Sequence, residues 1–120
     1  MNKTKVQNVK NWNVIPGKET LNSLLDRSKM HPQVIYKHSS RCSVSYLTKE
    51  ELEHHMDLLS NRANMHFINV IEQRELSNYL AERLNIRHES PQVLLLKDGR
   101  VTWNASHWNI KGKEILSNLV

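Results

Sequence analysis

One short block in the second half of the chain constrains the fold most. Ser90-Pro91 precedes an apolar run over 93–96, and Asp98-Gly99 follows that run after a single residue. A proline can begin a strand but cannot lie inside a central one, and Asp-Gly is a strong signal for a two-residue hairpin. The block therefore predicts a buried strand over 92–97 that returns as an antiparallel strand over 100–104.

Apolar spacing predicts the other elements: helices over 19–29, 73–84 and 109–119, and strands over 33–37 and 66–71. A strand-helix-strand unit followed by a hairpin and a helix gives a mixed sheet with helices on both faces. The connections between its parallel strands should be right-handed. We therefore expect an α/β fold with a central mixed sheet of about four strands.

The helix that follows Cys42 has two candidate starts. Apolar residues mark one helical face from Val44 onward, which places the first residue near Ser43. Thr48 and Glu51 have the spacing of a capping box, which would start the helix at Thr48 instead. The two alternatives stay open at this point, and only the first places Cys42 at a helix N-terminus.

Composition excludes several classes of protein. A single cysteine cannot form an internal disulfide, and it favours a reducing compartment, so we expect a cytoplasmic protein. The longest apolar run is too short for a membrane span, and the first twenty residues lack the apolar stretch of a secretion signal. We expect residues 1–17 to be a loosely ordered N-terminal segment and residues 18–120 to form one domain.

The basic residues are concentrated in the first third of the chain. The formal net charge is +5, and residues 1–41 hold eight basic against two acidic groups, a net charge of +6. Such a region could attract nucleic acid or an anionic small molecule, although a solvated face is the simpler interpretation. Aromatic residues do not interleave with the basic ones, so we do not expect nucleic acid as a partner. A basic nucleic-acid-binding protein is the weakest alternative.

Cys42 is the candidate nucleophile. A lone free cysteine is usually a small buried apolar residue, but Arg41, Ser43 and Ser45 around it are polar. If the helix begins beside it, the N–H groups of Val44 and Ser45 point at the sulfur and favour the thiolate. The Ser45 hydroxyl can donate a further hydrogen bond, and Arg41 adds a positive charge.

The seven histidines predict no metal site. His54 and His55 are adjacent, so on a helix they point about 100° apart, and the other five have no recognised ligand spacing. His38 is the exception to follow, because it lies four residues before Cys42 and could tune its thiolate. The tryptophans are expected to be packing residues: Trp12, Trp103 and Trp108.

Two segments resemble the thioredoxin fold. The block over 86–100 is similar to the second half of that fold, in which a proline at the position of Pro91 is cis. The first half agrees, because an apolar strand leads to a cysteine at the start of a helix. The segment 37–45, Lys-His-Ser-Ser-Arg-Cys-Ser-Val-Ser, most resembles the monothiol bacilliredoxins of the bacillithiol redox system. The likeness extends over about 18–120 and implies a thioredoxin-like three-layer fold.

Three positions near the cysteine distinguish this sequence from its relatives. The monothiol motif usually has threonine before the cysteine and proline after it, where this chain has Arg41 and Ser43. The second cysteine of thioredoxins is replaced by Ser45, which rules out a dithiol mechanism within one chain. The missing proline could loosen the first helical turn.

The resemblance implies a monothiol thiol-disulfide oxidoreductase. Cys42 would remove a small thiol, bacillithiol by resemblance, from mixed disulfides of client proteins, and the backbone of Ser90 beside Pro91 would pair with the substrate. A second small thiol or a partner reductase would then free Cys42. Bacillithiol would be a co-substrate, and no tightly bound cofactor is expected. The alternative is a thioredoxin-like binding or redox-sensing module without turnover, which the substituted motif favours.

Overall fold

The computed structural model describes residues 12–120. Five strands form one mixed sheet in the order β1-β3-β2-β4-β5. The strands are β1 (Asn13–Val14), β2 (Gln33–His38), β3 (Asn64–Asn69), β4 (Gln92–Lys97) and β5 (Arg100–Ser106). The helices are α2 (Lys18–Arg27), α3 (Ser43–His54), α4 (Met56–Arg62), α5 (Arg74–Leu84) and α6 (Gly112–Asn118), with a 3-10 turn, η1 (His107–Asn109).

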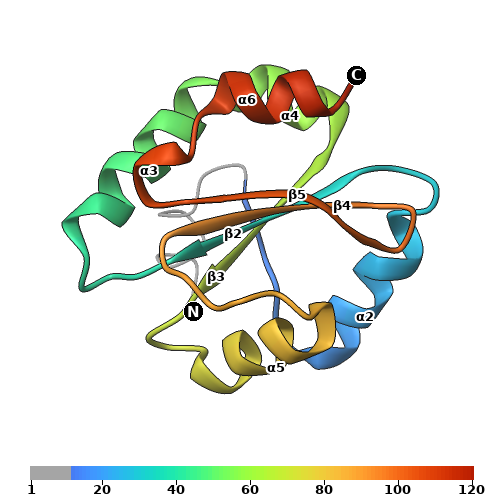
Figure 1. The fold of residues 1–120 in the computed structure, drawn as a ribbon, viewed down its shortest axis with the longest axis horizontal. Helices are drawn as coiled ribbons and strands as arrows, with labels where there is room; N and C mark the ends of the chain where they lie inside the picture. The colour runs from blue at the N-terminus through green and yellow to red at the C-terminus, as the bar shows by residue number, and fades with distance from the viewer. Residues whose placement is uncertain (1–11) are drawn as a thin grey trace, which may run out of the picture.

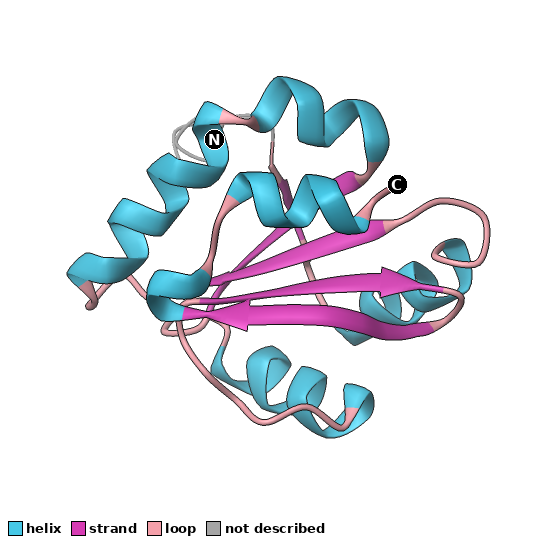
Figure 2. Ribbon diagram, turned by 45° about the horizontal axis from the view of Figure 1, so that its top comes forward, coloured by secondary structure: helices cyan, strands magenta, loops and turns pink. Residues whose placement is uncertain are grey.

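The sheet is the middle of three layers. In Figure 1, α2 and α5 lie on one side of the sheet, and α3, α4 and α6 lie on the other. Figure 2 shows the same separation from a second direction. The expected three-layer α/β fold is confirmed, but the sheet has five strands because β1 adds a short parallel strand beside β3. No helix within residues 12–120 is long and apolar enough to cross a membrane.

Part of the expected N-terminal segment is placed in the fold. Trp12 and Ile15 are buried at 6% and 1% exposure, and β1 lies between them. The Ile15 N–H donates to the Phe67 carbonyl oxygen of β3 at 3.1 Å. Residues 12–15 thus pack against the domain that we expected to begin at residue 18, whereas residues 1–11 lie outside the described part of the chain.

The central strand β2 joins the two halves of the sheet. It runs parallel to β3 and antiparallel to β4. All six of its residues are buried, because helices cover both faces of the sheet. Val34 and Tyr36 belong to the core beneath α3, α4 and α6, and Ile35 belongs to the core on the α2 and α5 side.

The pairing of β2 with β4 fixes where the two candidate site segments lie. Lys37 near the end of β2 pairs with Gln92 at the start of β4. Cys42 follows β2 by four residues, and Pro91 directly precedes β4. The pairing therefore brings the Cys42 segment and the Ser90-Pro91 segment to the same edge of the sheet, the one at which β2 ends and β4 begins.

Several element bounds differ from those expected. The helix after Cys42 begins at Ser43, so the first alternative is correct, and it is interrupted at His55 to give α3 and α4. The last helix begins at Gly112 because residues 107–109 form η1. The Asp98-Gly99 turn is present with φ values of 56° and 80°, the left-handed conformation that a type I′ hairpin requires.

Candidate active site

Cys42 is the N-cap residue of α3. Its backbone is extended (φ −120°, ψ 118°) and makes the turn from the β2–α3 loop into the helix. The side chain is half-buried, so the thiol is partly accessible. A thiol at the N-terminus of a twelve-residue helix lies where the helix dipole favours an anion.

The first turn of α3 differs in detail from the predicted arrangement. The Ser45 N–H donates to the Cys42 carbonyl oxygen at 3.0 Å, and the Cys42 side chain makes no capping hydrogen bond. The Ser45 hydroxyl is buried and accepts a hydrogen bond from the Ser39 N–H at 3.1 Å. The Ser45 N–H thus points at a carbonyl oxygen instead of the sulfur, and its hydroxyl holds the loop that carries Cys42.

Arg41 and Val44 lie on either side of this turn. The Arg41 residue is exposed, and its N–H donates to the Ser39 hydroxyl at 3.4 Å. Val44 is half-buried in the first turn of α3. Arg41 and Val44 thus flank the Cys42 turn, and Arg41 supplies its exposed positive charge.

Tyr36 is a residue of this site that sequence reasoning missed. Its hydroxyl donates to the Ser45 carbonyl oxygen at 2.7 Å and lies 2.9 Å from Thr48 Oγ1 and 3.3 Å from His38 Nδ1. Burial raises the pKa of Tyr36 well above its usual value, so the phenol stays neutral. A tyrosine on the same face of β2 as Val34 could have indicated this, because a buried phenol needs a hydrogen-bonding partner.

His38 is buried beside the first turn of α3 and is neutral at physiological pH. Its ring lies edge-on to Tyr46, with centroids 4.8 Å apart, and 5.4 Å from Phe67. Burial and, to a smaller extent, the nearby Lys49 ammonium lower the pKa of His38 to about 4. His38 therefore supplies packing and a hydrogen-bonding nitrogen near Cys42, and no positive charge at neutral pH.

The Ser90-Pro91 segment lies at the same sheet edge as Cys42. The peptide bond is cis, as the resemblance to the thioredoxin fold implies, and Pro91 is buried. The Pro91 carbonyl oxygen accepts a hydrogen bond from the His107 N–H at 3.0 Å. The Ser90 hydroxyl is buried and has no hydrogen-bonding partner among the described residues. The segment is thus joined to η1 through Pro91.

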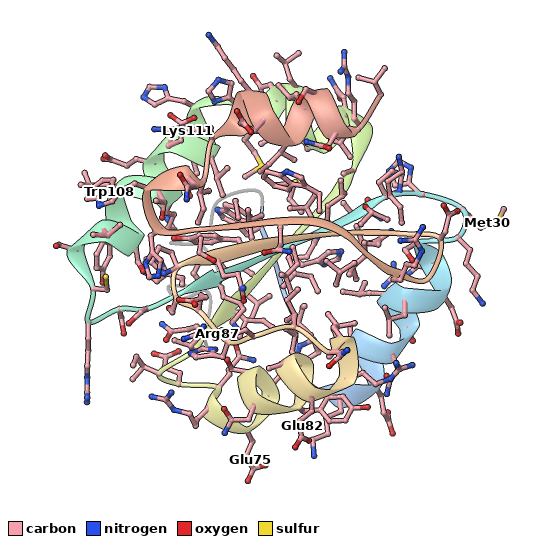
Figure 3. The ribbon with its side chains drawn as sticks, viewed as in Figure 1. Met30, Glu75, Glu82, Arg87, Trp108 and Lys111 are labelled. Carbon is pink, nitrogen blue, oxygen red and sulfur yellow. The ribbon has the colours of Figure 1, made fainter. Side chains whose placement is uncertain are left out.

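The three tryptophans have different environments. Trp12 is buried in the core, Trp103 is half-buried, and Trp108 in η1 is 60% exposed. Trp108 lies on the side of the molecule where η1 packs against α3 (Figure 3). The expectation that all three are packing residues is therefore wrong for Trp108, because the turn into η1 carries its indole to the surface.

The histidines do not assemble into a metal centre within the part of the chain that is placed. No group of three or more His, Cys, Asp or Glu side chains in residues 12–120 could hold a metal ion. His54 is exposed, whereas the His55 ring lies 3.1 Å from the Glu51 carbonyl oxygen. The two adjacent rings are thus in different surroundings.

Comparisons with known proteins agree with this architecture. The family model described as monothiol bacilliredoxin BrxC matches residues 13–115. A solved structure described as a putative oxidoreductase with a thioredoxin fold is 22% identical with a TM-score of 0.77, covering 89% of this chain and 92% of that one. Malassezia sympodialis thioredoxin is 16% identical with a TM-score of 0.69, covering 90% and 87%. Mitochondrial thioredoxin 3 from Saccharomyces cerevisiae is 13% identical with a TM-score of 0.67, covering 92% and 95%. These structural likenesses show a thioredoxin fold.

Proposed function

The chain belongs to the monothiol bacilliredoxin BrxC family, and from this membership we propose that it removes bacillithiol from protein mixed disulfides through Cys42. The family and the thioredoxin fold together support a thiol redox protein with oxidoreductase activity. The observation that carries the finer proposal is the position of the chain's single cysteine. It is half-buried at the N-terminus of α3 and shares a sheet edge with the Ser90-Pro91 segment.

The chemistry is thiol-disulfide exchange. The Cys42 thiolate attacks the bacillithiol sulfur of the mixed disulfide, and the client's cysteine leaves as a thiolate that takes up a proton. Cys42 then carries bacillithiol as a new mixed disulfide. One disulfide breaks as another forms, so the step needs no external oxidant or reductant.

A second reaction must regenerate the free thiol. The sequence has one cysteine, so no resolving thiol exists within the chain. We propose that a second molecule of bacillithiol, or a partner reductase, attacks the mixed disulfide on Cys42. With bacillithiol, the products are the free Cys42 thiol and the disulfide of two bacillithiol molecules.

The surroundings of Cys42 suit a modified client protein and an anionic small thiol. The backbone of Ser90 lies at the edge where an extended client segment would pair. Arg41 is exposed, so its guanidinium group is available to an anionic small thiol such as bacillithiol. The Arg87 side chain is 91% exposed, but its Nε lies 3.5 Å from Glu89 Oε2, so that guanidinium group is already paired. We place this reaction in the cytoplasm, because a reducing compartment favours a single cysteine that stays a free thiol.

The proposal is tested with a model client that carries bacillithiol on one cysteine. Wild-type protein should release the client's free thiol and gain the mass of one bacillithiol on Cys42, as seen by intact-protein mass spectrometry. Cys42→Ser should do neither while keeping the wild-type circular dichroism spectrum. A glutathionylated client run in parallel measures the preference for the small thiol.

Two outcomes would change the assignment. Release of the client thiol by Cys42→Ser would remove Cys42 from the mechanism. A wild-type protein that binds the client without releasing its thiol would favour the alternative function, a thioredoxin-like binding or redox-sensing module.

A further inference from the structure

Lys37 is a buried charged residue that thiol exchange at Cys42 does not use directly. It is on β2 and is 0% exposed, although lysine is almost never fully buried unless it is paired. Its Nζ lies 2.7 Å from His88 Nδ1 and 3.0 Å from Gln92 Oε1. Burial lowers the pKa of Lys37 to about 8, against an opposing effect of the Glu89 carboxylate. The side chain is therefore largely an ammonium at pH 7.

Both partners of Lys37 belong to the segment that carries Ser90-Pro91. This segment joins α5 to β4, and residues 86–89 have no helical or strand structure of their own. Arg87 marks the segment in Figure 3, on the α5 side of the sheet. The Gln92 side chain accepts from Lys37 through Oε1 and donates to the Arg87 carbonyl oxygen through Nε2 at 3.0 Å.

These contacts attach the segment to β2 on both sides of Ser90-Pro91. His88 precedes the pair and is exposed, and its Nδ1 contacts the buried ammonium of Lys37 at 2.7 Å. Gln92 follows the pair and is the register partner of Lys37 in the sheet. Because Lys37 contacts a residue on each side, a shift of Ser90 relative to β2 would break at least one hydrogen bond.

An apolar residue would be the ordinary choice at this position. The neighbouring Ile35 and Leu94 are buried in the core on the same side of the sheet, and a buried charge carries a desolvation cost that an apolar side chain avoids. What lysine adds is a donor that reaches two acceptors at once. Charge-assisted hydrogen bonds of this kind are shorter and stronger than neutral ones.

We propose that Lys37 is a positioning residue of the exchange site, whose ammonium fixes the 87–92 segment so that the Ser90 backbone faces a substrate bound at Cys42. This inference rests on the proposed function, because it assumes that Ser90 pairs with the client. On the opposite face of β2, Tyr36 holds the first turn of α3. One strand thus positions both segments of the site.

The test compares two reactions of Cys42 in Lys37→Met. Exchange with the bacillithiol-modified client should show a KM raised by about 10-fold or more, the equivalent of losing one charge-assisted hydrogen bond. Alkylation by iodoacetamide, a small reagent that needs no pairing with Ser90, should stay within about twofold of wild type. Lys97→Met, at the far end of β4, is the matched control and should leave both reactions unchanged.

Two further measurements report on the segment without any substrate. In wild-type protein, the ring 15N shifts of His88 should show an unprotonated Nδ1 and a protonated Nε2, as an acceptor from Lys37 requires. In Lys37→Met, the amides of residues 87–90 should exchange hydrogen faster while those of β2 keep their protection. If Lys37→Met does not fold, His88→Ala should produce the same split between exchange and alkylation.

The possible results separate this inference from the proposed function. An unchanged KM in folded Lys37→Met, or an alkylation rate that falls in proportion with exchange, would overturn the role of Lys37. A wild-type protein that fails to exchange with the client would overturn the proposed function, and the role of Lys37 at a client site with it. The His88 ring shifts and amide exchange would then still show whether Lys37 holds the segment.

Discussion

The hydroxyl of Tyr36 donates a hydrogen bond to the carbonyl oxygen of Ser45 across 2.7 Å. Both residues are fully buried. The bond joins the central strand to the first turn of α3, and the Ser45 N–H in turn donates to the Cys42 carbonyl oxygen. The position of the Cys42 backbone is therefore set by a side chain six residues earlier in the sequence.

Replacing Tyr36 with phenylalanine should destabilise the protein by about 1–2 kcal/mol, because the buried Ser45 carbonyl oxygen and the Thr48 hydroxyl lose a partner. Urea denaturation should show a lower midpoint with an unchanged m-value. Tyr79→Phe is the control, since its half-buried hydroxyl bonds Asn22 at the surface. Equal losses in the two variants would contradict a special role for the Tyr36 hydroxyl.

Ser45→Ala removes the acceptor of the buried Ser39 N–H. An unpaired buried N–H costs about 1–3 kcal/mol, and the loop that carries Cys42 should loosen, so we expect a lower stability and slower thiol exchange. Ser43→Ala removes an exposed hydroxyl from the same turn and should change both quantities much less. Equal exchange rates in the two variants would show that the Ser45 hydroxyl does not hold the loop that carries Cys42.

Stability should fall in mild acid because of two buried histidines. Burial lowers the pKa of both His38 and His66 to about 4, whereas an unfolded histidine titrates near about 6.5. Between these values the unfolded chain binds more protons than the folded one, so the free energy of unfolding decreases as pH falls from about 6.5 to about 4. Each histidine lowers the free energy of unfolding by roughly 3 kcal/mol over the full range from about pH 6.5 to about pH 4.

Urea denaturation at pH 7 and at pH 5 measures this effect. His66→Gln is the informative variant, because glutamine can still bond Gln33, which His66 Nε2 contacts at 2.8 Å. Its unfolding free energy should lose about half of the wild-type pH dependence. A pH-independent stability in the wild-type protein would show that these histidines are not held neutral.

Gly112→Ala should destabilise the packing of α6 on α3. A Cβ atom at residue 112 would lie 2.5 Å from His55 Nδ1 and 2.9 Å from the His55 Cβ, so the backbone or the ring must move. We expect a loss of about 1–3 kcal/mol. His55→Ala should recover part of that loss in the double variant, as measured by a double-mutant cycle.

Gly17→Ala is the matched control for this substitution. A Cβ atom there meets nothing within 4 Å, and the extended φ of −176° suits any residue. Because glycine is a better N-cap residue than alanine, its cost should be about 0.5–1 kcal/mol, below the cost expected for Gly112→Ala. If Gly112→Ala were equally mild, the contact with His55 would not restrict residue 112.

Much of the fold could be predicted from local patterns. The bounds of β4 agree with the prediction, because Pro91 and the Asp98-Gly99 turn mark both ends of that strand. In contrast, β1 has two residues, and its partner β3 lies some fifty positions later in the sequence. A strand that short has no periodicity of its own to detect, so only its pairing with β3 defines it.

The sequence by itself determined the chemistry that is available. It supplied one thiol with no resolving partner, polar neighbours for that thiol, and a proline before a buried strand with a hairpin signal after it. It also supplied the resemblance to monothiol bacilliredoxins, which the family comparison confirmed. These properties depend on residue type and spacing, which the chain carries before it folds.

Only the tertiary structure decided which partners the buried polar groups have. The Ser45 N–H was expected to point at the sulfur, but it donates to the Cys42 carbonyl oxygen, and the Ser45 hydroxyl accepts from the Ser39 N–H. Lys37 reaches His88, fifty-one positions away, and nothing in the residue types predicts that pair. Hydrogen bonds act over about 3 Å and depend on direction, so strand pairing and loop path select the partners, and those appear only when the sheet has formed.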